Sequence, residues 1–511
     1  MKYLVTGKEM KLLDKNTSSY FQVPELVLME QAAMCFVWRL CDILKETIEN
    51  KNAKGIVFCG LGNNGADGLA IARLLNEKGI YTEVCKTNEV FTIQGSTSDS
   101  FQVQEKIYAA YNYPVQNQIS VILNTKYDFV IDAVFGIGLS RPLNEEYAKI
   151  IQCINDTKGK KFAVDMSSGV NADNGQVMGA AVKCDYTITF SYGKLGQYVW
   201  PGSEYSGNVF VENMGITEAS WLDMRPEMAY LESSDLGLLP KRPAHSNKGT
   251  FGKLLVIAGS LDMAGAAVFT AKAAYRCGVG LVKVFTHKEN RVILQKSVPE
   301  ALVSMYGDSI NKKQLITDIE WADAIVIGPG IGQSSIAHEL VEIVRSSSSV
   351  PVVWDADGLN ILSQNTESLL LPHAKYIMTP HIGEFSRLIN KSVFWIQNHL
   401  IESAREFAST YGVVCVLKDF HTVCANFQGI NYLNLSGNNG MATGGSGDVL
   451  AGIIGALLLQ GLNEIEASAF GVYIHGLTGD YVREKMGTHS MMASDIIDAL
   501  KEVWKGIDYA E

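Results

Sequence analysis

The sequence Ile56-Val-Phe-Cys-Gly-Leu-Gly62 is followed at once by Asn63-Asn-Gly-Ala-Asp-Gly68 and then by a run with helical spacing, residues 69–78. A short apolar run that ends at glycine is typical of a buried strand. The glycine-rich part predicts a loop, and the last part predicts a helix. A strand, a glycine loop and a helix in this order begin a nucleotide-binding βαβ unit.

The same alternation continues after this unit. We predict strands at residues 81–87, 129–135, 162–165 and 186–190, and a helix at 98–111. This rhythm is typical of a doubly wound α/β fold, a mostly parallel sheet with helices on both faces. Before it, residues 6–40 have helical spacing around Pro24 and predict a packing or subunit-contact element. The apolar face expected there consists of Leu26, Leu28, Met29, Ala32, Ala33 and Phe36.

Polar side chains gather where the predicted strands end. They are Asn63, Asn64, Asp67, Asp132, Asp165 and Ser168. A single Asp after a strand is usually a helix cap or a turn residue. Ligands of parallel sheets, however, bind at the carboxyl ends of the strands, where all of these residues are expected to meet. Oxygen ligands at one rim suit a hard monovalent or divalent cation beside a phosphate.

The alternation lapses between residues 215 and 252, a stretch that contains Pro226, Pro240 and Pro243. We therefore predict two domains, residues 1–220 and 221–511, which suits a chain of 511 residues. A second βα series begins at residues 253–260 and a helix at 264–277, with further strands at 281–286, 324–328, 352–354, 376–378 and 413–417. Polar loops follow these strands at residues 328–332, 355–358, 379–384 and 418–422.

Residues 437–452 read Gly-Asn-Asn-Gly-Met-Ala-Thr-Gly-Gly-Ser-Gly-Asp-Val-Leu-Ala-Gly and run into an apolar segment. Glycines let successive backbone N–H groups turn toward a phosphate, and a helix starting near Asp448 adds its positive end. Asp is also a common N-cap residue. A carboxylate beside a bound phosphate nevertheless calls for a reason, and a base facing a hydroxyl that will be phosphorylated supplies one.

Composition restricts the class of protein. The net charge of -11 argues against a nucleic-acid partner, which usually leaves a basic footprint. The nine cysteines are scattered and predict neither disulfides nor a thiolate metal site, as expected for a cytoplasmic protein. The longest apolar runs are too short to span a bilayer, so we expect no membrane association.

Several motifs together resemble a known enzyme family. The first domain resembles the NAD(P)H-hydrate epimerases through residues 63–68, 132–138 and 164–169, and the second resembles the ribokinase-like, ADP-dependent NAD(P)H-hydrate dehydratases through residues 245–249, 328–330, 379–384 and 444–448. Their order is that of the fused bifunctional repair enzymes. One departure is Ala66, where the epimerase pattern usually has Gly; a methyl group is tolerated there unless the position needs a positive φ.

The resemblance implies substrates and site residues. Substrates would be NADH or NADPH hydrated at C6 (NADHX and NADPHX), together with ADP. In the epimerase, K⁺ would be bound near Asn64, Asp132 and Ser168. The hydrate would be contacted by Asn63, Asn64, Gly65, Ala66, Asp67, Gly136, Ile137, Gly138, Leu139, Ser140, Arg141, Pro142 and Asp165. In the dehydratase, the hydrate would touch Ala266, Gly330, His381 and Asp448. The nucleotide would lie against Lys418, Asp419, Phe420, His421, Thr422, Asn438, Asn439, Gly440, Met441, Ala442, Thr443, Gly444, Gly445, Ser446 and Gly447.

The expected chemistry follows from hydroxide being a poor leaving group. Phosphorylation of the C6 hydroxyl, with Asp448 as the base and Mg²⁺ screening the diphosphate, lets the ring nitrogen expel it. In the epimerase, the hydrate either opens or loses water and regains it, and Asp165 is the candidate for proton transfer. The alternative function is a ribokinase-like kinase of small alcohols with a non-catalytic N-terminal binding or scaffold domain. A homo-oligomer is expected in either case.

Overall fold

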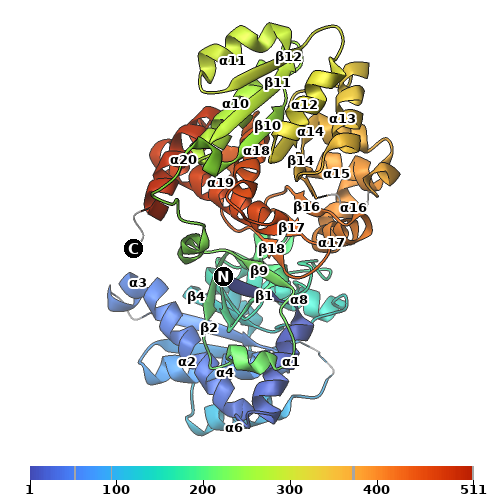
Figure 1. Cartoon of the computed structure of the whole chain (residues 1–511). Helices are drawn as coiled ribbons and strands as arrows, with labels where there is room; N and C mark the ends of the chain where they lie inside the picture. The colour runs from blue at the N-terminus through green and yellow to red at the C-terminus, as the bar shows by residue number, and fades with distance from the viewer. Residues whose placement is uncertain (51–52, 92, 94, 371–374, 509–511) are drawn as a thin grey trace. The chain divides into compact units, whose positions relative to one another are not determined.

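The computed structural model describes residues 1–50, 53–91, 93, 95–370 and 375–508 (Figure 1). It divides into two compact units, one of Tyr3–Glu227 and one of Met228–Glu511 with Met1–Lys2. Each unit contains its own sheet and core, and each is described separately.

The first unit is built around a fully parallel sheet with the order β3-β2-β4-β5-β6-β8. Its strands are β2 (Lys54–Cys59), β3 (Tyr81–Lys86), β4 (Lys126–Ala133), β5 (Lys158–Val164), β6 (Tyr186–Phe190) and β8 (Asn208–Glu212). The chain places β3 on one side of β2 and then β4 and the later strands on the other side, so the order of the strands reverses at the gap between β2 and β4. In doubly wound sheets a ligand crevice opens at such a switch point.

Helices cover both faces of this sheet. One core joins α2 (Glu25–Ile43), α4 (Asn63–Glu77) and α6 (Asp99–Ala110) to one set of strand side chains. The other core joins α7 (Ile119–Asn124) and α8 (Glu145–Asp156) to the alternate set. Successive side chains of a strand point to opposite faces of the sheet, and in β2 Val57 accordingly belongs to the first core and Ile56 to the second. The predicted fold class is confirmed.

Two local predictions in this unit were wrong. Residues 63–68 are not a loop, because α4 already begins at Asn63. The glycines there serve close packing: a Cβ on Gly65 would lie 1.9 Å from the Gly60 carbonyl oxygen, and one on Gly68 would lie 2.6 Å from Ala133 Cβ. Leu26, which was expected on the apolar face of α2, is 42% exposed.

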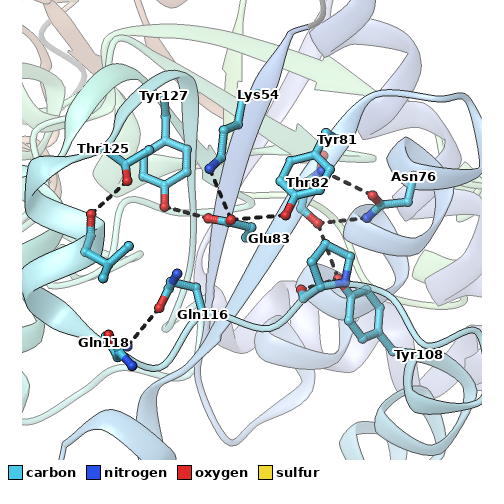
Figure 2. A network of polar contacts seen from close by, with 12 residues as sticks. Lys54, Asn76, Tyr81, Thr82, Glu83, Tyr108, Gln116, Gln118, Thr125 and Tyr127 are labelled. Atoms are coloured by element: carbon cyan, nitrogen blue, oxygen red, sulfur yellow. Dashed lines mark hydrogen bonds and ion pairs between the residues drawn. The ribbon is translucent and has the colours of Figure 1, made fainter.

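A polar network closes the amino-terminal ends of β2, β3 and β4, away from the carboxyl ends where ligands are expected (Figure 2). Its centre is the buried Glu83. Tyr127 Oη donates to Glu83 Oε2 at 2.7 Å, Tyr81 Oη donates to Oε1 at 3.3 Å, and Lys54 Nζ lies 3.1 Å from Oε1. One carboxylate thus joins three neighbouring strands.

The sheet of the second unit has the order β12-β11-β10-β13-β14-β15-β16-β17-β18-β9. From β12 to β16 the pairs are parallel, whereas β16–β17 and β17–β18 are antiparallel. The strands are β9 (Met228–Tyr230), β10 (Lys253–Ile257), β11 (Leu281–His287), β12 (Leu302–Tyr306), β13 (Ala324–Ile327), β14 (Val352–Trp354), β15 (Tyr376–Met378), β16 (Val414–Leu417), β17 (Val423–Ala425) and β18 (Asn431–Leu433). The sequence analysis missed β9, β12, β17 and β18.

The helices α10 (Ala264–Arg276), α18 (Ser446–Leu458), α19 (Glu464–Met486) and α20 (Ala493–Asp508) share one core with the strands. A Cβ on Gly452 would lie 2.3 Å from the carbonyl oxygen of Thr270, so α18 meets α10 almost backbone to backbone. The contact between α18 and α10 helps to fix the start of α18, which carries Asp448.

The remaining longer helices of this unit are α11 (Arg291–Ser297), α12 (Lys312–Trp321), α13 (Ser335–Ser347), α14 (Ala356–Leu362), α15 (Ile382–Ile389) and α17 (Leu400–Tyr411).

Candidate functional sites

A pocket of about 880 Å³ opens in the first unit at the carboxyl ends of β2, β4 and β5, where ligands were predicted to bind. Ten of the residues predicted to bind the hydrate line it: Asn63, Asn64, Asp67, Gly136, Ile137, Gly138, Leu139, Ser140, Arg141 and Asp165. Gly65 and Ala66 do not, because both are buried in α4. Pro142 is exposed and also lies outside the lining. The helical Ala66 has no positive φ, so its methyl group is accommodated without strain.

Asp165 is held in a demanding position at the end of β5. Its φ of 64° is left-handed, a region that costs a non-glycine residue free energy. Its Oδ1 accepts hydrogen bonds from Lys194 Nζ at 2.5 Å, from Thr189 Oγ1 at 2.8 Å and from the Phe190 amide at 3.4 Å. The side chain of Lys194 is 1% exposed. Sequence reasoning missed Lys194, which no motif singles out.

A second missed residue is Asp14 of α1 (Gly7–Ser19), which lines the same pocket as Asp67. Burial raises the pKa of Asp14 to about 6, with Lys194 lowering it and Asp165 raising it. Burial also holds the pKa of Asp67 well above its ordinary value, and the charges of Asp165 and Asp14 act in the same direction. The pocket therefore contains two carboxyl groups that retain protons far more readily than an exposed Asp.

Two of the three predicted cation ligands, Asp132 and Ser168, contact each other, and the third, Asn64, lines this pocket. Asp132 is completely buried; its Oδ1 accepts from Ser168 Oγ at 2.6 Å and its Oδ2 from the Ser168 amide at 2.8 Å. Burial raises the pKa of Asp132 to about 6, which these hydrogen bonds oppose. No Lys or Arg among the described residues forms an ion pair with it, and Asn64 Nδ2 is buried without a partner. A buried carboxylate without a counter-charge, next to hydroxyl and amide oxygens, suits a monovalent cation.

In the second unit, Lys418 and Asp355 form the electrostatic centre of the site. Lys418 Nζ donates to Asp355 Oδ1 at 2.9 Å, and Thr379 Oγ1 donates to the same oxygen at 2.7 Å. Burial alone lowers the pKa of Lys418, but Asp355, Glu384 and Asp448 together raise it above its ordinary value. The lysine is therefore charged at neutral pH. Asp355 was predicted only as part of a polar loop.

Asp448 lies in the first turn of α18, as predicted. The turn is opened by Gly445, whose φ of 90° favours glycine. The pKa of Asp448 is raised to about 7, chiefly by burial and then by the charge of Asp355, which together outweigh the lowering by Lys418. A carboxyl group with this pKa can accept a proton and release it again near neutral pH.

The glycine loop before α18 is anchored by residues that the sequence analysis did not select. Asp480 of α19 accepts from the Gly437 amide at 2.8 Å and from Asn438 Nδ2 at 3.0 Å. His475 Nε2 lies 3.3 Å from Ser446 Oγ, and burial lowers the pKa of this histidine to about 4, so it is neutral. A Cβ on Gly447 would lie 3.4 Å from Lys418 Nζ, which brings the loop to the lysine.

Several of the other predicted contact residues lie in loops or at helix starts of the same unit. His381 caps α15, because its Nδ1 accepts a hydrogen bond from the Gly383 amide at 2.9 Å. Burial and the charges of Lys418 and Arg387 lower the pKa of His381, so its ring is neutral. The Lys418 amide donates to the Pro380 carbonyl at 2.8 Å, which joins residues 379–384 to residues 418–422.

The predicted hydrate contacts Gly330 and Ala266 lie against each other. Gly330 has a φ of 60°, and a Cβ on it would be 2.9 Å from the Ala266 Cβ. Phe420 is 68% exposed beside His421.

Two family models match consecutive parts of the chain. Residues 254–502 match the model described as NAD(P)H-hydrate dehydratase, and residues 25–196 match the model of the YjeF-related protein N-terminus. The bifunctional NAD(P)H-hydrate repair enzyme of Moorella thermoacetica is 33% identical over 99% of this chain and 97% of that protein. The chain belongs to the bifunctional NAD(P)H-hydrate repair enzymes.

The comparisons with other members and with solved structures agree. The repair enzyme of Thermofilum pendens is 34% identical over 98% of this chain and 95% of its own length. The ADP/ATP-dependent NAD(P)H-hydrate dehydratase of Bacillus subtilis, co-crystallised with ATP and Mg²⁺, is 32% identical; it aligns with 54% of this chain and 98% of its own at a TM-score of 0.50. The predicted family and the ribokinase-like fold of the second domain are therefore confirmed. Among the described residues, no helix is long and apolar enough to cross a membrane.

Proposed function

We propose that the first unit interconverts the R and S hydrates of NADH and NADPH, and that the second dehydrates the S form while ADP becomes AMP and phosphate. One observation carries the proposal: Asp448, with a pKa of about 7, lies at the start of α18 beside Lys418 and a glycine loop. This is where a base is needed if a substrate hydroxyl is to receive a phosphoryl group.

The dehydratase reaction begins with the C6 hydroxyl facing Asp448. Asp448 takes the hydroxyl proton while the oxygen attacks the terminal phosphorus of ADP. Lys418 and the first amides of α18 stabilise the negative charge on the transferring group. The phosphorylated oxygen then leaves, because the lone pair on the ring nitrogen drives it out. Loss of a proton from C5 restores the dihydronicotinamide.

Magnesium would supply charge screening of the diphosphate in this reaction. No group of three or more His, Cys, Asp or Glu side chains is arranged to hold a metal in the part of the chain that the structure describes. The ion would therefore be held mainly by phosphate oxygens, as is usual for Mg²⁺, with Asp357 as the nearby carboxylate. The nucleotide would lie against residues 418–422 and the loop 438–447.

In the first unit, Asn63, Asn64 and the loop 136–141 would hold the nicotinamide end of the hydrate, and Asp165 would accept a hydrogen bond from one of its hydroxyl groups. Asp132 and Ser168 would hold K⁺, with Asn64 as a further oxygen ligand. The cation would supply positive charge next to the bound phosphates. The buried and uncompensated Asp132 supports this assignment.

A direct assay tests the whole proposal. The full chain is incubated with a mixture of R and S NADH hydrate, ADP and Mg²⁺, and the near-ultraviolet absorbance of NADH is followed. Recovery beyond the initial S fraction is expected, because epimerisation feeds dehydration. No recovery would favour the kinase alternative, and recovery that stops at the S fraction would favour a non-catalytic first unit.

The predicted homo-oligomer and cytoplasmic location belong to the same proposal. Val27, Met34 and Trp38 of α2 are 44%, 57% and 58% exposed and recur at helical spacing, which suits contact with a second copy. Analytical ultracentrifugation of the full chain and of a Trp38→Glu variant tests this. A shift of the variant toward monomer is expected.

A further inference from the structure

Two carboxyl groups in the first pocket, those of Asp14 and Asp67, have no chemical role assigned to them in the proposed reaction, although Asp67 is expected to contact the hydrate. Asp14 comes from α1 and Asp67 from α4, and both line the pocket. Within the described ranges, neither makes a hydrogen bond or an ion pair with another residue. The buried Asn64 Nδ2, on the same wall, is also without a partner. A ligand that enters this pocket of about 880 Å³ can therefore interact with all three groups.

Lys194 does not neutralise these two groups by contact. Its Nζ donates to Asp165 Oδ1 at 2.5 Å, to Thr189 Oγ1 at 2.8 Å and to the Phe190 carbonyl at 3.0 Å, which uses all three of its N–H groups. Asp165 in turn receives three donors on one oxygen. This pairing suits Asp165 to anchor the substrate, and it leaves proton transfer to other groups.

Epimerisation at C6 requires proton transfer on both faces of the ring. A hydroxyl that leaves from one face must be protonated there, and a water that adds to the other face must lose a proton there. We propose that Asp14 and Asp67 are the catalytic acid and base of the epimerase, one on each face of the hydrated ring. This inference rests on the proposed epimerase function and assigns its proton carriers.

The step is balanced without any further reactant. The protonated carboxyl group donates its proton to the C6 oxygen, the C6–O bond breaks, and water departs with the bonding electrons. The lone pair of the ring nitrogen forms a double bond to C6. A water on the other face then bonds to C6, its proton passes to the ionised carboxylate, and the nitrogen regains its lone pair. The two carboxyl groups have exchanged protonation states, so the site is ready for the reverse reaction.

The electrostatics of the pocket suit this exchange. Asp14, with a pKa raised by burial to about 6, faces Lys194, Asp165 and Glu25. Asp67, whose pKa is held well above the ordinary value by burial, faces Asp165 and Asp14. The repulsion between the two carboxylates favours a state in which one of the pair carries a proton and the other is ionised.

The test uses full-length Asp14→Asn and Asp67→Asn variants with purified R hydrate. We expect each to lower the kcat of epimerisation at least ~100-fold with little change in KM, as loss of a general acid or base does. Dehydration of S hydrate should be unchanged. Asp99→Asn, at an exposed position of α6 outside the pocket, is the matched control and should epimerise normally. Asp14→Glu should restore part of the rate, which separates proton transfer from a folding defect.

Two further readouts keep the inference apart from the proposed function. Epimerisation in oxygen-18 water should place the heavy oxygen at C6 of the product. Three outcomes would overturn this inference and leave the proposed function standing. They are a product without the heavy oxygen, Asn variants in which KM rises while kcat is unchanged, and Asn variants that both epimerise at the wild-type rate. Failure of the unaltered chain to epimerise any hydrate would overturn the proposed function of the first unit.

Discussion

The amine of Lys418 lies 2.9 Å from Asp355 Oδ1, so the lysine whose charge acts on Asp448 is already paired with another carboxylate. Burial and the charge of Asp355 raise the pKa of Asp448 to about 7 in spite of this nearby cation. A fully available Lys418 would make Asp448 a weaker base. The pairing therefore tunes the proposed base toward neutral pH.

Replacing Asp448 by Asn should abolish dehydration, because an amide cannot accept the hydroxyl proton. We expect a loss of ~100-fold or more in kcat. ADP should still bind, since the loop amides and Lys418 are unchanged, and epimerisation should be intact. Calorimetric titration with ADP and the NADH absorbance assay measure the two properties. Normal dehydration by the variant would refute the assignment.

Dehydration should depend on the ionisation of Asp448. The carboxylate form is the base, so kcat for S hydrate should rise with pH, with a midpoint near the pKa of about 7. Asp355→Asn removes a charge that raises the pKa of Asp448 and frees Lys418 to lower it. The midpoint should therefore move to lower pH. Asp308→Asn, at a 99% exposed side chain, should leave the profile in place.

Removal of potassium should affect only one activity. Dialysis against a buffer with a bulky organic cation should slow epimerisation, and added K⁺ should restore it, while dehydration of S hydrate continues. Asp132→Asn should lose the response to K⁺, because the buried charge that the cation balances is gone. Equal rates with and without K⁺ in the unaltered chain would contradict the site.

The network in Figure 2 should matter for stability rather than catalysis. Glu83→Ala leaves Tyr127 Oη and Tyr81 Oη without their acceptor and Lys54 without its partner. The free energy of unfolding of the first unit should fall by roughly 1–3 kcal/mol. The exposed pair of Glu146 and Lys149 provides the control, since Glu146→Gln should leave the unfolding curve close to that of the unaltered chain. Urea unfolding curves of the two variants measure the difference.

Much of the architecture could be read from the sequence, because apolar runs that end in glycine or Asp repeat along both halves. The loops that follow them also carry most of the candidate site residues. The pattern was misleading where glycine has a packing role. Gly65 and Gly68 looked like loop residues, yet they lie in α4, where a Cβ would collide with Gly60 and Ala133.

The residues that the sequence did not reveal come from elements without a glycine signature. Asp14 is one of many polar residues on α1, so nothing in the sequence distinguishes it from the solvent-facing ones. Lys194 is placed by the two-residue strand β7 (Gly193–Lys194), which pairs with Leu4 and Val5 at the other end of the unit's sequence. Similarly, β17 and β18 have three residues each, too few for a period to be visible.

The residues that line the first pocket all come from Tyr3–Glu227, and Asp448, Lys418 and the glycine loop all come from the other compact unit. The side chains of one site are thus not shared with the other. In evolutionary terms, a mutation can alter the rate of one repair step and leave the other untouched. Selection is then free to match the supply of the S hydrate to its consumption, one gene segment at a time.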